Sequence, residues 1–137
     1  MQVKEIMNRE VEVIHANIPL RAAAEKMKTL DVGMLPVRDA DRLVGMLTDR
    51  DIVIRGIAGG LDISKTEVKD VITPDVIYCF EDAEVGEAAK LMQEKQIRRL
   101  IVLNRDKRLA GILSIGDLAG QSGSDKLAGE TVKRVSQ

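Results

Sequence analysis

The sequence predicts an α/β fold of the α+β kind, built from two copies of one β-α-β-β-α unit. The first observation is an internal repeat, because residues 3–52 align with residues 68–118 at an offset of 65 that becomes 66 after one extra residue in a polar turn. The second observation is a pair of apolar runs in each copy. The third observation is that apolar residues with helical spacing precede these runs in each copy. Self-similarity at a fixed offset indicates one structural unit used twice. A unit of about 50 residues is marginal alone, so we expect the two sheets to pack together with pseudo-two-fold symmetry.

Each copy is expected to begin with a short strand and an amphipathic helix. The strands are expected at "VEVI" (11–14) and "VIYCF" (76–80). Pro19 is expected in the first turn of the first helix, where its missing N–H costs nothing. The residues that give the helical spacing are Leu20, Ala23, Ala24 and Met27 in the first copy and Val85, Ala88, Ala89 and Met92 in the second.

A hairpin and a second helix complete each unit. "MLPV" and "RLVGML" are separated by "RDAD", and "LIVL" and "RLAGIL" by "NRDK", which is the pattern of two strands joined by a polar turn. A helix is then expected to start at a Thr/Ser-x-x-Asp element, at Thr48–Asp51 and Ser114–Asp117.

The chain therefore divides into four expected segments. The first unit is 1–58 and the second is 68–120, with a Gly-rich and polar linker at 59–67. The polar segment 121–137 is expected to be a frayed end or a short helix.

Composition excludes several classes of function. The chain of 137 residues has 21 Lys+Arg and 22 Asp+Glu, so no overall positive field attracts nucleic acid or an anionic membrane. It has no Trp, one Tyr and one Phe, which argues against stacking of single-stranded bases. No apolar run approaches the roughly 20 residues that span a bilayer, and the first residues lack the apolar stretch of a signal peptide. We therefore expect a cytoplasmic protein.

The residues that often perform catalysis are isolated. Cys79 is the only cysteine and lies in an apolar run, so we expect a buried strand residue and neither a disulfide nor a structural zinc site. His15 has no second His and no Cys near it and is expected at a turn or strand end. No nucleophile-base-acid set is visible, so an enzyme is not expected.

The Thr/Ser-x-x-Asp elements allow two interpretations. The N–H groups at a helix start attract anions, a hydroxyl can donate to a phosphate, and an acid three residues later can accept from a ribose diol, which together would bind a nucleotide. The same spacing is also that of a helix cap, which needs no ligand. Duplication alone would copy a cap, so the recurrence leaves both interpretations open.

The pattern "MLPV" followed by "LVGMLTDRDI" resembles the cystathionine-β-synthase-like (CBS) domain, and the two copies look like a tandem CBS pair, often called a Bateman module. The likeness covers roughly residues 2 to 119, and "TDRDIVIRGIAGGLD" is similar to small free-standing bacterial and archaeal CBS-pair proteins. The resemblance implies two units paired through their sheets and two modules assembled as a flat, disc-like homodimer. It further implies that AMP, ADP or ATP, or S-adenosylmethionine or NAD, binds in clefts between the units as a regulatory ligand, with no cofactor required.

Matching positions assign the residues of the two implied clefts. One would use Thr48 and Asp51 with Thr73, Val76, Ile77, Ile97 and Arg98. The other would use Ser114, Asp117 and Arg99 with Asn8, Val11, Glu12, Val32 and Gly33. Arg99 corresponds to Met34, so the clefts are expected to differ in affinity for phosphate. Arg98 corresponds to Gly33 and could stack on the base or obstruct its pocket, or the two arginines could form an ordinary solvated basic pair.

Two functions of different classes remain. The first is a sensing module that binds an adenosine nucleotide and signals its occupancy to a protein partner that the sequence does not identify. The second is a structural or interaction protein, a CBS-pair dimer with empty clefts whose Thr/Ser-x-x-Asp elements are only caps.

Overall fold

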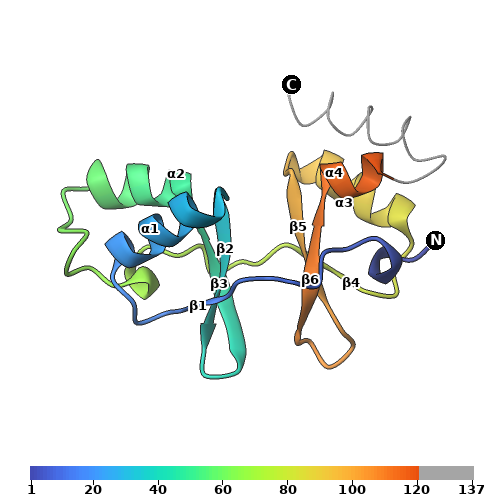
Figure 1. Cartoon of the computed structure of the whole chain (residues 1–137), viewed down its shortest axis with the longest axis horizontal. Helices are drawn as coiled ribbons and strands as arrows, with labels where there is room; N and C mark the ends of the chain where they lie inside the picture. Colours follow the sequence, from blue (N-terminus) through green and yellow to red (C-terminus); the bar gives the residue numbers. More distant parts are fainter. Residues whose placement is uncertain (121–137) are drawn as a thin grey trace. The chain divides into compact units, whose positions relative to one another are not determined.

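The structure is a computed structural model of the chain, and it describes residues 1–120. The chain folds into two compact units. The middle unit is Glu12–Val76, and the terminal unit combines Met1–Val11 with the chain from Ile77 to the end of the described residues. Each unit contains a three-stranded sheet accompanied by helices, as Figure 1 shows, and this confirms the predicted α+β class.

The middle unit follows the predicted β-α-β-β-α order. Its strand β1 runs parallel to β2, and β2 and β3 form the antiparallel hairpin. The helix α2 continues directly into a π-helix, η2, which the sequence did not indicate. The elements are β1 (Ile14–His15), α1 (Leu20–Leu30), β2 (Met34–Asp39), β3 (Arg42–Thr48), α2 (Asp49–Asp51), η2 (Ile52–Ile57) and the 3-10 turn η3 (Val68–Asp70).

The terminal unit repeats this topology. Strand β4 is parallel to β5, and β5 is antiparallel to β6. The elements are the 3-10 turn η1 (Val3–Glu5), β4 (Tyr78–Phe80), α3 (Val85–Lys95), β5 (Arg99–Leu103), β6 (Leu109–Ser114) and α4 (Ile115–Ala119).

In both units the helices cover one face of the sheet. Alternate residues of a strand point to the same face, so Leu35 and Val37 of β2 and Leu47 of β3 lie together, each at most 2% exposed. Ala23 and Met27 of α1 pack into the same core. The equivalent core of the terminal unit contains Leu100, Val102, Leu113, Ala88 and Met92.

The first strands are shorter than expected. β1 is Ile14–His15 where 11–14 was predicted, and β4 is Tyr78–Phe80 where 76–80 was predicted. Each is an edge strand, and only these residues have partners on the neighbouring strand. Pro19 lies at the N-cap of α1 and not in its first turn, with the extended ψ of 148°.

The start of each sequence repeat packs in the unit formed by the other repeat. Val3 N donates to Ala83 O at 2.9 Å, and in the matching position Val68 N donates to Ile18 O at 2.9 Å. Asn8 and Ile112 exchange two backbone hydrogen bonds of 2.9 Å, as Thr73 and Met46 do at 3.0 and 3.1 Å. The compact units therefore differ from the expected division into 1–58 and 68–120, because residues 1–11 pack with the second repeat and residues 68–76 pack with the first. We call 1–11 and 68–76 the exchanged segments.

The expected linker 59–67 packs on the start of α1. Leu20 N donates to Thr66 O at 2.9 Å, and Arg21 N donates to Ile63 O at 3.0 Å. These bonds satisfy N–H groups in the first turn of the helix, which have no partner inside it. The expected tail 121–137 lies outside the described residues.

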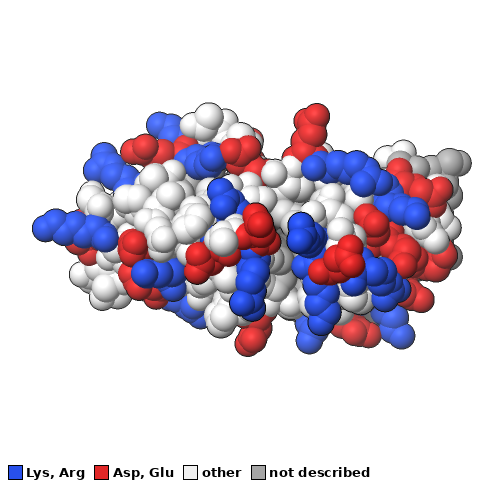
Figure 2. Space-filling model, turned by 90° about the horizontal axis from the view of Figure 1, so that it is seen from below, with Lys and Arg blue, Asp and Glu red and all other residues white. Residues whose placement is uncertain are grey.

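The face drawn in Figure 2 shows no strong charge asymmetry. On the face drawn in Figure 2, basic and acidic side chains are interspersed, in agreement with the net charge of -1. Within residues 1–120, no helix combines the length and the apolar character that crossing a membrane requires.

Candidate functional site

Both Thr/Ser-x-x-Asp elements form reciprocal helix caps. Asp51 N donates to Thr48 Oγ1 and Thr48 N donates to Asp51 Oδ2, both at 3.0 Å. At the second element, Asp117 N donates to Ser114 Oγ at 3.1 Å and Ser114 N donates to Asp117 Oδ2 at 2.8 Å. The capping interpretation is thus confirmed. It does not decide the question of a ligand, because each hydroxyl keeps its own O–H to donate and the cap uses only one oxygen of each carboxylate.

The sheet register places each hydroxyl opposite a residue that differs between the copies. Ser114 pairs with Arg99 across β6 and β5, and Thr48 pairs with Met34 across β3 and β2. Directly opposed residues share a face of the sheet. Leu113 and Leu47 point toward the helices, so these two pairs lie on the face that the helices leave open.

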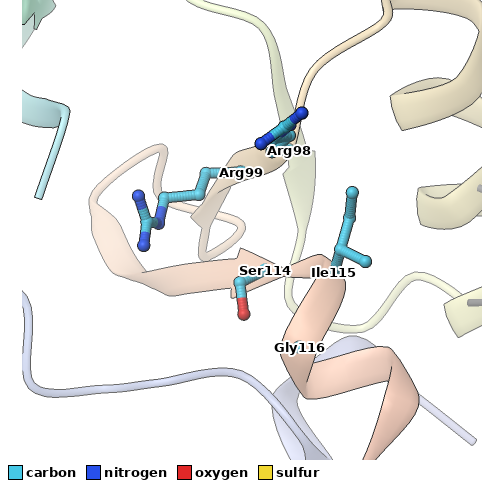
Figure 3. A pocket seen from close by; sticks show the side chains of 5 residues that line it. All are labelled: Arg98, Arg99, Ser114, Ile115 and Gly116. Carbon is cyan, nitrogen blue, oxygen red and sulfur yellow. The ribbon is translucent and has the colours of Figure 1, made fainter. Parts of the chain in front are cut away.

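A pocket of about 470 Å³ lies beside Ser114 in the terminal unit. Figure 3 shows Arg99 and the Ser114 hydroxyl extending from the ends of two neighbouring strands, while Arg98 points in a different direction. Both arginines are exposed, so their charges act through solvent and are screened by salt. A guanidinium and a hydroxyl at one pocket can donate several hydrogen bonds to one phosphate. The lining residues are Arg98, Arg99, Ser114, Ile115 and Gly116.

The corresponding place in the middle unit has a different character. Asp49 N donates to Gly33 O at 2.9 Å, in the same way that Ile115 N donates to Arg98 O at 3.1 Å. A Cβ added to Gly33 would lie 3.0 Å from Asp49 Oδ2, so a carboxylate lies next to Gly33.

A further contact involves the exchanged segment. Thr73 Oγ1 donates toward both oxygens of Asp51, at 3.5 and 3.4 Å. Arg55 of η2 donates to Val71 O at 3.3 Å and to Ile72 O at 3.1 Å, which holds the approach to Thr73 against the helix.

Each predicted cleft draws residues from both compact units. The structure brings Thr48, Asp51 and Thr73 together in the middle unit, and Ser114, Asp117 and Arg99 in the terminal unit. Of the first predicted set, Val76 also belongs to the middle unit, and Ile77, Ile97 and Arg98 to the terminal unit. Of the second, Asn8 and Val11 belong to the terminal unit, and Glu12, Val32 and Gly33 to the middle unit. The assembly of either full set into one cleft stays a prediction.

Two of the predicted residues have other partners inside their units. Glu12 forms an ion pair of 2.6 Å with Lys26, and Asn8 Oδ1 accepts from Glu10 N at 3.0 Å. Asp49, Ile115 and Gly116 were not among the predicted residues. Comparing the two copies position by position would have shown that Asp49 stands where Ile115 does.

The isolated Cys and His have structural positions. Burial raises the pKa of the Cys79 thiol from 9.0 to about 11, which makes it a poor nucleophile at neutral pH. His15 Nδ1 accepts from Asn17 N at 3.1 Å, at the end of β1. Within residues 1–120, no three His, Cys, Asp or Glu side chains are grouped as metal ligands.

A surface cluster near Cys79 closes the β5–β6 turn onto β4. Arg105 donates to both oxygens of Asp82, at 2.8 and 2.9 Å, and its guanidinium lies 4.1 Å from the centre of the Phe80 ring. The hydrogen bonds from Arg105 lower the pKa of Asp82. This cluster has a structural role, because it joins the β5–β6 turn to the end of β4 and to the turn that follows β4.

Two β-α-β-β-α units in one chain, each with a capped Thr/Ser-x-x-Asp helix start, define a tandem-repeat module. The sequence model of the CBS domain matches residues 3–56 and 68–122, and the chain belongs to this family. Hypoxic response protein 1 of Mycobacterium tuberculosis is 40% identical over 117 residues, which cover 85% of this chain and 81% of that protein.

Solved structures agree with this assignment. A crystal structure of Hypoxic Response Protein I with two coordinated zinc ions is 38% identical, with a TM-score of 0.80, and the match covers 89% of this chain and 99% of that one. The CBS domain pair of the protein MJ0100, in complex with 5′-methylthioadenosine and S-adenosyl-L-methionine, is 27% identical with a TM-score of 0.75. That match covers 87% of this chain and 93% of that one.

Proposed function

We propose that the chain is a non-catalytic regulatory module that binds an adenosine nucleotide or a related adenosyl ligand and signals its occupancy to a protein partner. The observation that carries this proposal is the pocket lined by Arg98, Arg99 and Ser114, together with the Asp117 carboxylate that accepts from Ser114 N. The adenosine-based ligands of the MJ0100 domain pair support the ligand class.

The chemistry of the pocket fits a nucleotide. Arg99 and the free O–H of Ser114 can donate to a phosphate, and the second oxygen of Asp117 can accept from a ribose hydroxyl. Ser114 and Asp117 can make these contacts without breaking the cap, because the cap uses only a lone pair of Ser114 Oγ and the Oδ2 atom of Asp117.

A second candidate is a structural or interaction protein of the same fold with no ligand. The two complete capping boxes favour it, since both elements are satisfied without any bound molecule. In either case we expect a cytoplasmic homodimer.

A thermal-shift experiment with AMP, ADP, ATP, NAD and S-adenosylmethionine separates the two. A ligand that binds only the folded state stabilises it by about 2.7 kcal/mol at 100 times its Kd, so we expect a saturable rise in Tm with at least one of them.

The variants locate the site. Asp117→Asn keeps a side-chain oxygen that can accept from Ser114 N and therefore tests ligand binding with little effect on the cap. We expect this variant and Arg99→Met to reduce the shift, while Arg108→Met, which removes an exposed charge outside the pocket, keeps it. No shift with any of the five at millimolar concentration would contradict the sensing function and favour the interaction protein.

A further inference from the structure

We propose that each chain binds one phosphate-bearing nucleotide, at the Ser114–Asp117 element, and that the Thr48–Asp51 element is closed to phosphate and has only a structural role. This inference rests on the proposed function. Three differences between matching positions of the two units support it. Each one favours nucleotide binding at Ser114–Asp117 over binding at Thr48–Asp51.

The first difference is the charge beside the hydroxyl. Arg98 and Arg99 line the pocket at Ser114, and their counterparts next to Thr48 are Gly33 and Met34. The middle unit therefore lacks, at these positions, the donors that would hold a phosphate.

The second difference is the residue that follows the hydroxyl. Ile115 in the terminal unit is uncharged, whereas Asp49 in the middle unit places Oδ2 within 3.0 Å of the position of a Cβ on Gly33. A carboxylate beside this position repels a phosphate that approaches Thr48 from the side of Gly33. Asp49 and Arg50 are both exposed, so solvent screens each charge, and Arg50, which stands where Gly116 does, offsets part of the repulsion.

The third difference is whether the carboxylate of the element already accepts a hydrogen bond from a side chain. Thr73 Oγ1 already donates toward both oxygens of Asp51, at 3.4 and 3.5 Å. The residue matching Thr73 is Asn8, whose amide oxygen accepts from Glu10 N instead. Among the hydrogen bonds of residues 1–120, the Asp117 carboxylate accepts only from Ser114 N, so it remains open to a ribose hydroxyl.

Isothermal titration of the full chain with ATP, and separately with AMP, tests the inference through stoichiometry. We expect one nucleotide per chain. Arg99→Met should weaken ATP binding by about tenfold, since it removes a charge-assisted contact. Raising the NaCl concentration should weaken binding in the wild type more than in this variant.

A second experiment tests whether the middle unit gains an ATP site when it receives the matching residues of the terminal unit. The triple variant Gly33→Arg, Met34→Arg, Asp49→Ile gives the middle unit the residues found at 98, 99 and 115, and it removes the carboxylate that would meet the new side chain at 33. We expect this variant to bind two ATP per chain, with its fold verified by circular dichroism and by urea unfolding.

The outcomes distinguish the inference from the function beneath it. Two ATP per wild-type chain, or ATP binding that survives Asp117→Asn and disappears in Asp51→Asn, would overturn the single-site inference and leave the nucleotide-binding function intact. A folded triple variant that still binds one ATP would overturn the exclusion assigned to these positions. No binding of either nucleotide to the wild type would overturn the single-site inference, and the proposed function would fall with it only if ADP, NAD and S-adenosylmethionine also failed to bind.

Discussion

Gly45 and Gly111 occupy matching positions in β3 and β6 because another segment of backbone approaches them closely. A Cβ on Gly45 would lie 2.6 Å from Thr73 O, and a Cβ on Gly111 would lie 2.7 Å from Asn8 O. These carbonyl groups belong to the exchanged segments, which pair with Met46 and Ile112 next to the glycines. The two glycines therefore permit the contact through which each segment joins its sheet.

The substitution Gly111→Ala should destabilise the fold by about 1–3 kcal/mol, because the new methyl group meets backbone that cannot move aside easily. Gly86→Ala is the matched control. Apart from its chain neighbours and the nearby backbone of α3 itself, no atom lies within 4 Å of a Cβ at that position, so alanine should stabilise the helix by about 0.5–1 kcal/mol. Urea unfolding measures both. Equal stability of the two variants would contradict the close approach at Gly111.

The residues of the candidate site were predictable to different degrees. Ser114, Asp117 and Arg99 were identified from the repeat and the family likeness, and the structure brings them together. The contact of Asp51 with Thr73 was not foreseen as a contact within one unit, because these residues are 22 positions apart and belong to different sequence repeats.

At the scale of elements, the exchanged segments complete the two cores. Val3, Ile6 and Met7 are at most 9% exposed and pack with α3, β5 and β6, while Val68 and Val71 pack in the core of the middle unit. The segment 1–11 is thus an integral part of the terminal unit, although α3 begins more than 70 residues later.

The substitution Met7→Ala should therefore lower the free energy of unfolding by about 2–5 kcal/mol, the cost of a cavity in a core. Leu30→Ala is the control, since Leu30 is 43% exposed at the end of α1 and its truncation should change stability by less than about 0.5 kcal/mol.

Hydrogen exchange gives the location of the Met7→Ala effect. We expect the amides of α3 to lose more protection than those of α1, because only α3 packs against Met7. Equal loss of protection in both helices would contradict the assignment of this segment to the terminal unit.

At the scale of the whole molecule, the predicted homodimer needs an apolar surface. Three neighbouring aliphatic residues of η2 offer one, since Val53 and Ile54 are 51% exposed and Ile57 is 59% exposed. Grouped exposed apolar side chains of this kind mark contact surfaces in soluble proteins.

The substitution Ile54→Glu should convert the dimer to a monomer, because it places a charge among these side chains, and light scattering coupled to size-exclusion chromatography measures the mass. Leu30→Glu introduces the same charge on an exposed leucine outside η2 and should leave the dimer intact. A monomeric wild type, or an Ile54→Glu variant that remains dimeric, would contradict the prediction.

The elements of this protein were predictable because they depend on local patterns. Helical spacing, paired apolar runs and the Thr/Ser-x-x-Asp caps are properties of a few neighbouring residues, and they recur in both copies. The exchange of 1–11 with 68–76 could not be predicted, because the two segments carry similar apolar residues at matching positions, such as Val3 and Val68, and a local pattern does not say which core each one joins. Backbone pairing of Asn8 with Ile112 and of Thr73 with Met46 decides which sheet each segment joins, and it brings the Thr73 hydroxyl within hydrogen-bond distance of the Asp51 carboxylate. Local periodicity thus specified the units, and the sequence itself carries the charge differences between the two sites at residues 33, 34 and 49 and at 98, 99 and 115. Contacts between distant segments decided which segment belongs to which unit and which acid Thr73 contacts.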